Sequence, residues 1–155
     1  LGLLLLAVSM EAAALFFQYV LDYGPCMLCI HVRIWVFGLI LVALFTLAGR
    51  VRKSLLVAGH FLVGVIGAGL LERSWQLLGV ERGTIEGMCS MDLGLPAWFA
   101  LDSWFPVLFK AWEPCGYTPQ LLFGITMAEA LVVMSIMLLV ISLVFVTATL
   151  AARRV

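Results

Sequence analysis

The sequence predicts an all-α membrane protein: a four-transmembrane-helix bundle with a short amphipathic interfacial helix in the second outer loop. The 155 residues are 65% hydrophobic and 12% charged, with a mean hydropathy of +1.17, unlike a soluble domain. The apolar residues form continuous runs, whereas the strands of a membrane barrel alternate with a period of two. Each run has close to the ~20 residues that a helix needs to cross a bilayer.

Four runs are the predicted spans of a single domain covering residues 1–155; they comprise about 1–21, 30–48, 55–71 and 121–150. The first begins with neither methionine nor a charged amino-terminal region, so we expect a spanning helix with a trimmed start rather than a cleavable signal. The fourth is about ten residues longer than a span needs, which suggests tilt or a projecting end.

An even number of spans places both termini on one side and the two outer loops, residues 22–29 and 72–120, on the other. The basic residues of the turn after the second span and of the chain end are Arg50, Arg52, Lys53, Arg153 and Arg154. Because lysine and arginine gather in cytoplasmic loops, we expect cytoplasmic termini and outward-facing cysteines.

All four cysteines lie in or beside the outer loops: Cys26 and Cys29 in the first, Cys89 and Cys115 in the second. Disulfides persist in an oxidising outer compartment. A Cys26–Cys29 bridge closes too short a loop to add much stability, which favours a bridge that is exchanged over a structural one. For Cys89 and Cys115, a structural staple is an equally strong alternative, and spacing alone leaves the pairing open.

Composition and motifs disfavour several other classes. A structural zinc site commonly uses two close cysteine pairs, and this chain has one, so we expect no metal. The formal net charge is zero and no basic tract suggests nucleic-acid binding. The sequence contains no haem, iron–sulfur or flavin motif.

Arg33 follows Cys29 by four residues in the stretch YGPCMLCIHVR. If the second span starts near Cys29, the two side chains share one helix face. The helix amino terminus and the cation then favour a reactive thiolate at Cys29. A membrane dithiol needs an electron acceptor, and a quinone held by Cys29 and Arg33 would serve. An arginine that snorkels to lipid headgroups is the alternative.

Taken together, these features resemble the disulfide bond formation protein B (DsbB) family of bacterial inner-membrane enzymes. The resemblance covers nearly the whole chain and rests on the four spans, on PCMLCIHVR and on the outer loop MCSMDLGLPAWFALDSWFPVLFKAWEPC. It implies an enzyme that reoxidises a periplasmic thioredoxin-fold thiol oxidase (DsbA-like). Its electrons would pass through two cysteine pairs to a quinone, ubiquinone or menaquinone.

The resemblance also implies a role for each site residue. Cys89 and Cys115 would form the outer disulfide, with Cys89 forming the mixed disulfide with the partner. Cys115 would then pass electrons to the Cys26–Cys29 pair. Cys29 would face the quinone, and Arg33 would bind and polarise it. Many family members carry glutamine or glutamate just before this arginine, where this chain has valine.

Residues 93–112 are rich in aromatic side chains at roughly helical spacing, but they are too polar and too broken by prolines to span. Tryptophans favour the water–lipid boundary, so we expect an interfacial helix here. Aromatic packing over the bundle top and a docking patch for the partner are alternatives. Glu11 and Glu129 lie about ten residues into their predicted spans, so we expect both acids near mid-membrane. Polar residues in or beside the spans whose roles the sequence leaves open are Glu11, Glu129, His60, Arg73 and Gln76.

Two alternative functions remain at this point. The vitamin K epoxide reductase family also contains four-helix quinone reductases, but its membrane-side Cys-X-X-Cys comes late in the chain, whereas here it opens the second span. A non-enzymatic tetraspan scaffold with structural disulfides is the other. For such a scaffold, cysteine removal would lower stability without abolishing electron flow.

Overall fold

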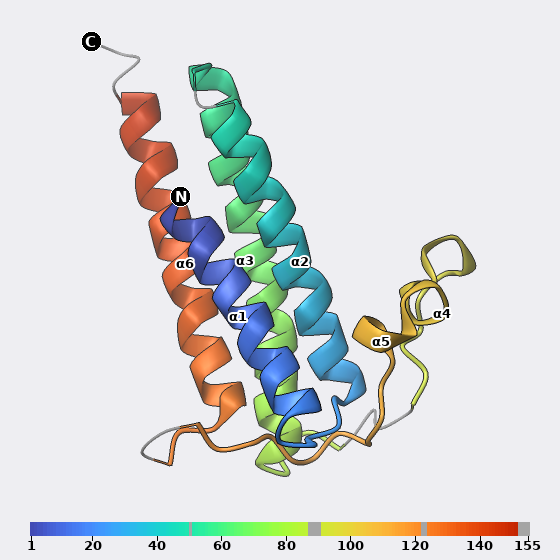
Figure 1. Cartoon of the computed structure of the whole chain (residues 1–155). Helices are drawn as coiled ribbons and strands as arrows, with labels where there is room; N and C mark the ends of the chain where they lie inside the picture. The colour runs from blue at the N-terminus through green and yellow to red at the C-terminus, as the bar shows by residue number, and fades with distance from the viewer. Residues whose placement is uncertain (50, 87–90, 122–123, 152–155) are drawn as a thin grey trace.

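The computed structural model describes residues 1–49, 51–86, 91–121 and 124–151. Four long helices form its body: α1 (Gly2–Tyr19), α2 (Met27–Ala48), α3 (Lys53–Glu81) and α6 (Met127–Ala151). Figure 1 shows them side by side in one bundle. The connections from α1 to α2 and from α3 to α6 meet at one end, which we call the cysteine end. The described residues contain no strand, only an isolated bridge between Gln120 and Thr126.

Each of the four helices is long and apolar enough to cross a membrane. Large apolar side chains cover their outward faces; examples are Leu5, Leu41, Phe61 and Leu143. Helices satisfy their own backbone hydrogen bonds, so such apolar exteriors suit a bilayer. The predicted all-α class and the four-helix transmembrane bundle are therefore confirmed.

The helix α3 is longer than one membrane crossing needs. This helix runs to Glu81, beyond the predicted end of the third span at residue 71. Lys53 and Arg73 are 20 residues apart on it. At ~1.5 Å per residue they are separated by about 30 Å along the axis, the thickness of a bilayer's hydrocarbon core. A hydrocarbon core with one boundary at Lys53 would therefore have its other boundary near Arg73, with the last two turns of α3 beyond it.

Close packing around α3 depends on glycine. This helix packs against α2 and α6, while α1 packs against α2. A Cβ atom on Gly69 would lie 2.5 Å from the indole of Trp35, and one on Gly64 would lie 2.7 Å from Ser142 Oγ. The glycines Gly64 and Gly69 therefore let α2 and α6 approach α3 closely.

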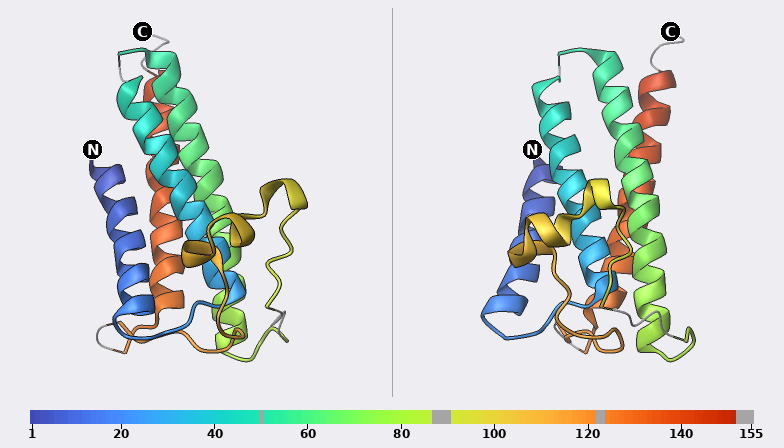
Figure 2. Two further views of the ribbon diagram at one scale, coloured as in Figure 1. Left: turned by 45° about the vertical axis from the view of Figure 1, so that its right-hand side comes forward. Right: turned by 90° about the vertical axis from the view of Figure 1, so that its right-hand side faces the viewer.

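Between α3 and α6, the described residues 91–121 form no long helix. They contain the 3₁₀ turn η1 (Ala97–Phe99) and two one-turn helices, α4 (Leu101–Trp104) and α5 (Pro106–Phe109). Figure 2 shows these elements on the flank of the bundle beside α2. Pro106 starts α5 and cannot continue the hydrogen bonding of α4, so the segment breaks into short turns. A location at the membrane surface stays a prediction.

The last of these turns, α5, is attached to the spanning helices. Phe109 is buried and meets the ring of Phe37 edge-on, with 6.1 Å between the ring centroids. The Tyr19 hydroxyl, at the end of α1, donates to the Val107 carbonyl. The second loop is therefore fixed against α1 and α2 close to the first cysteine pair.

Candidate redox site

The first turn of α2 positions Cys26 and Cys29. Cys26 is the N-cap residue with extended backbone (φ −84°, ψ 170°), and its sulfur accepts a hydrogen bond from the Cys29 N–H at 3.3 Å. This cap turns both side chains toward each other, so that their sulfur atoms lie 2.7 Å apart. The pair is therefore arranged to open and close a bridge with little movement of the chain.

Cys115 reaches the same place from the second loop. The Trp112 N–H donates to the Pro25 carbonyl at 2.9 Å, which ties the second loop to the residue before Cys26. Gly24 permits this approach, because a Cβ atom there would lie 2.7 Å from Glu113 Cγ. The Cys115 thiol is then hydrogen-bonded with Cys26. Three of the four predicted cysteines thus meet at one point.

Hydrogen bonds between the sulfur atoms, together with burial, keep two of these thiols protonated. The hydrogen bond with Cys26 and burial raise the pKa of Cys115. For Cys26, the hydrogen bond from Cys115 lowers the pKa, but the hydrogen bond with Cys29 and burial outweigh it and raise the pKa to about 12. Both side chains lie in an apolar cluster with Leu77 and Phe109. At neutral pH Cys26 and Cys115 are therefore neutral thiols when reduced.

Cys89 lies outside the described residues. The predicted Cys89–Cys115 disulfide and the role of Cys89 toward a partner therefore stay predictions. The structure places the Cys26–Cys29 pair beside Cys115.

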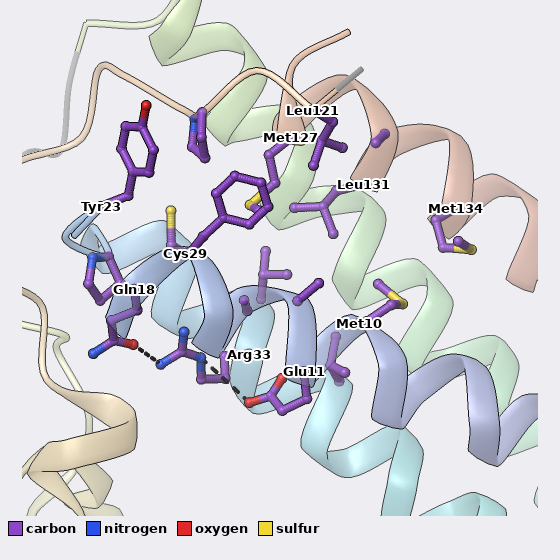
Figure 3. A pocket seen from close by; sticks show the side chains of 18 of the residues that line it. Met10, Glu11, Gln18, Tyr23, Cys29, Arg33, Leu121, Met127, Leu131 and Met134 are labelled. Atoms are coloured by element: carbon purple, nitrogen blue, oxygen red, sulfur yellow. Dashed lines mark hydrogen bonds and ion pairs between the residues drawn. The ribbon is translucent and has the colours of Figure 1, made fainter. Parts of the chain in front are cut away.

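A cavity of about 250 Å³ opens beside Cys29, between α1, α2 and α6 (Figure 3). Its wall is mostly apolar; Met10, Phe17, Val36, Leu131 and Met134 contribute. The polar groups are few and come mainly from the first two helices: Glu11 and Gln18 on α1, and Arg33 on α2, one turn after Cys29. A flat, apolar molecule with a few hydrogen-bond acceptors matches such a wall.

Arg33 points into the bundle instead of toward the headgroups. Its guanidinium Nη1 donates to Gln18 Oε1 at 2.8 Å and to the Leu108 carbonyl at 2.5 Å. Glu11 Oε1 lies 3.5 Å from Nε, and the two charged side chains are only 4% (Arg33) and 12% (Glu11) exposed. The guanidinium is therefore a fixed, buried cation at the cavity wall, one turn from the Cys29 sulfur.

Two of the polar residues around this cation were not assigned from the sequence. The sequence marks Glu11 as an acid within a span but gives it no partner, and it gives no reason to select Gln18. Glu11 and Gln18 are seven residues apart on α1. Because seven residues make about two helical turns, the two side chains lie on the same face of the helix. That spacing, opposite an arginine in the next span, is the signal that would have found Gln18.

The remaining polar candidates lie elsewhere. Glu129 was expected near mid-membrane, which is wrong: it lies in the first turn of α6, exchanges hydrogen bonds with Thr126 and pairs with Arg82 at 2.7 Å. His60 stacks on Phe145, with ring centroids 4.8 Å apart, and lies seven residues after the start of α3 at Lys53, toward the end of the bundle where α2 finishes. Arg73 and Gln76 bond to each other at 3.2 Å and do not line the cavity beside Cys29.

Comparison with known proteins points to one family. The family model described as "Disulfide bond formation protein DsbB" matches residues 1–145. Disulfide bond formation protein B of Shewanella loihica is 36% identical over 132 residues, which cover 84% of this chain and 77% of that protein. Disulfide bond formation protein B 2 of Pseudomonas aeruginosa is 35% identical over 157 residues, covering 99% of this chain and 86% of that protein.

The ion pair of Arg33 predicts a double-mutant result. Glu11→Ala should lower the free energy of unfolding by about 3 kcal/mol, because it leaves a buried charge without its partner. Replacing both residues, as in Glu11→Leu with Arg33→Met, should recover much of that loss. Denaturant unfolding in detergent, followed by circular dichroism, measures both. Glu72→Ala, at an exposed site on α3, is the control; equal losses in Glu11→Ala and Glu72→Ala would contradict a buried ion pair.

The raised pKa values predict an order of thiol reactivity in the fully reduced protein. Between pH 7 and 9, iodoacetamide should modify Cys29 well before Cys26 and Cys115, whose thiols are buried and protonated. Because the thiolate fraction rises tenfold per pH unit below the pKa, Cys26 should still be gaining reactivity at pH 10. Peptide mass spectrometry after timed quenching reads each site. Faster alkylation of Cys26 than of Cys29 at pH 7 would contradict the assignment.

Proposed function

Because the chain belongs to the DsbB family of disulfide bond formation proteins, which are disulfide-generating oxidoreductases of the membrane, we propose that it reoxidises a thioredoxin-fold (DsbA-like) dithiol oxidase and delivers the electrons to a membrane quinone. One observation carries the proposal. Cys115 from the second loop meets the Cys26–Cys29 pair beside an apolar cavity that contains a buried arginine. The arrangement joins a dithiol exchange site to a site for a lipid-soluble acceptor.

The relay begins in the second loop. A thiolate of the reduced partner attacks Cys89 of the Cys89–Cys115 disulfide, which forms a mixed disulfide and releases Cys115. Cys115 then attacks Cys26, and the Cys26–Cys29 bond breaks with Cys29 leaving as a thiolate. The hydrogen bond between Cys115 and Cys26 supports this choice of target sulfur.

In the second half of the relay, both disulfides of the protein form again. The partner's second thiol attacks the mixed disulfide, so the partner leaves oxidised and Cys89 is released. Cys89 then reforms its bond to Cys115 and frees Cys26. Cys26 and Cys29 are rejoined as their two electrons and two protons leave for the acceptor. The net reaction converts one partner dithiol and one quinone into a disulfide and a quinol.

The cavity residues fit a quinone by their hydrogen-bonding capacity. Gln18 Nε2 is a buried donor without a hydrogen-bond partner among the described residues, and Arg33 Nε makes no hydrogen bond there beyond its 3.5 Å ion pair with Glu11 Oε1. Buried donors without partners are costly, and carbonyl oxygens would satisfy them. A bound quinone supplies a two-electron, two-proton acceptor with two carbonyl groups. Ubiquinone and menaquinone share these groups.

Each residue of the site has a separate task in this proposal. Cys29 presents the sulfur that faces the acceptor, at the amino terminus of α2. Arg33 stabilises negative charge on that sulfur and on the acceptor oxygen, and Glu11 and Gln18 hold Arg33 in place. The apolar wall excludes water, which strengthens these interactions.

Orientation follows from charge in the same way. Arg52 and Lys53 stand at the start of α3, and α2 runs from the cysteines to the turn before them. Their position at the opposite end of α2 from the cysteines supports a cytoplasmic location for that end of the bundle and for both termini. The cysteine end then faces the periplasm, across the bacterial inner membrane. A soluble thioredoxin-fold partner would meet the second loop there.

Purified protein, a short-chain quinone and a reduced thioredoxin-fold oxidase test the relay, with quinone absorbance as the readout. Turnover should be lost in Cys29→Ser and in Cys89→Ser, since each removes one sulfur of the chain of exchange. Ser9→Ala, an exposed change on α1, should turn over normally. If the folded and correctly bridged protein reduces no quinone with any dithiol donor, the tetraspan scaffold with structural disulfides becomes the better description.

A substitution at Arg33 distinguishes the reduction of the quinone from the thiol exchange with the partner. Arg33→Gln should lower kcat/KM for the quinone by roughly 10- to 100-fold, the range expected when a hydrogen bond from a charged donor is lost. The rate at which the reduced partner forms its mixed disulfide with Cys89 should stay within twofold, because that step takes place outside the cavity. Stopped-flow quinone absorbance and acid-quenched gels measure the two steps. Equal slowing of both would assign Arg33 to structure alone.

A further inference from the structure

A second cavity, of about 640 Å³, lies between α2, α3 and residues 92–95. It shares no residue with the cavity beside Cys29. From α2 it is lined by Met27, His31, Ile34 and Trp35, which occupy the face opposite Cys29 and Arg33 at helical spacing. The relay has no use for this cavity.

Its depth matches a lipid headgroup. Arg73, which lines it, lies about 30 Å along α3 from Lys53, so a hydrocarbon core that begins at Lys53 would end near Arg73. His31, from the second turn of α2, also lines the cavity. Apolar side chains complete the wall: Met27, Ile34, Trp35, Leu93 and Leu95. A phospholipid has a polar headgroup and apolar acyl chains, so it matches a cavity at the membrane boundary with polar groups beside an apolar wall.

The polar groups present a cation and an anion together. Arg73 is half-buried and uses one guanidinium nitrogen for Gln76, at 3.2 Å, and a guanidinium carries five N–H donors. Asp92 also lines this cavity; its Oδ1 accepts the Gly94 N–H at 2.9 Å, and a carboxylate oxygen can accept more than one hydrogen bond. An anionic headgroup would meet the Asp92 charge unfavourably, whereas a zwitterion complements both residues.

His31 adds an acceptor. Its Nε2 lies 3.0 Å from the Leu93 carbonyl, so in the neutral ring Nε2 carries the hydrogen and donates it. Nδ1 is then an acceptor, and it is buried without a hydrogen-bond partner among the described residues. A headgroup with N–H donors satisfies this atom, while a quaternary ammonium headgroup has no hydrogen to donate.

We propose that this cavity binds the headgroup of a phospholipid with a primary ammonium group. Arg73 binds the phosphate, and Asp92 and His31 Nδ1 accept hydrogen bonds from the ammonium. The acyl chains lie along the apolar side chains of α2 and α3. The bound lipid also fixes residues 92–95, which follow Cys89 closely in the sequence.

Native mass spectrometry of the purified full-length chain tests the site. The protein is delipidated in detergent and then given phosphatidylethanolamine, phosphatidylcholine or phosphatidylglycerol at equal mole fraction. Wild type should retain phosphatidylethanolamine at least tenfold better than either of the others. Arg73→Gln should reduce this retention to the level of phosphatidylcholine, and Asp92→Asn should remove the preference for ethanolamine over choline. Lys53→Gln makes the matched change at the opposite boundary and should leave retention unchanged.

Three results would overturn the proposal. They are equal retention of the three lipids by wild type, a preference for phosphatidylglycerol, and unchanged retention in both Arg73→Gln and Asp92→Asn. If Arg73→Gln does not yield monodisperse protein, Arg73→Lys, which keeps the charge and should retain the lipid, and Asp92→Asn decide the question. Because lipid retention is measured without a quinone or a partner, the result is independent of the redox relay.

Discussion

The bundle near its cysteine end is organised around one buried positive charge. A guanidinium in an apolar interior is tolerable only when it is paired and hydrogen-bonded. Arg33 on α2 therefore requires Glu11 and Gln18 on α1 and the Leu108 carbonyl on α5. These contacts hold α1, α2 and α5 around the Arg33 guanidinium, and an apolar cavity lies on one side of this group. The cavity is thus a by-product of the way in which the charge is satisfied.

The same helix places the sulfur atoms. The extended backbone of Cys26 caps α2, so Cys29 falls in the first turn and Arg33 in the next. The bond from the Trp112 N–H to the Pro25 carbonyl brings Cys115 to the cap from far along the chain. Sulfur exchange and acceptor binding are therefore adjacent because both are built on the first two turns of α2.

The sequence was sufficient for the all-α class and for the four spanning helices, because hydropathy is a local property. Short spacings also singled out the four cysteines and Arg33, whose predicted roles stay predictions. The sequence was insufficient for features whose position depends on contacts between segments that are far apart in the chain. The meeting of Cys115 with Cys26 is such a contact, and so is the burial of Arg33. Glu129 was misplaced because the apolar run starting at residue 121 includes residues before α6 begins at Met127. The Thr126-X-X-Glu129 capping pattern marked that start.

The attachment of α5 has a mechanical consequence. Its carbonyls at Val107 and Leu108 accept hydrogen bonds from Tyr19 and Arg33, on two different spanning helices. Any displacement of this turn removes an acceptor from Arg33 and frees one of its N–H groups toward the cavity. The position of α5 therefore affects the electric field around Arg33 inside the bundle. A protein that docks on the loop and shifts α5 changes the field at the Cys29 sulfur without touching it.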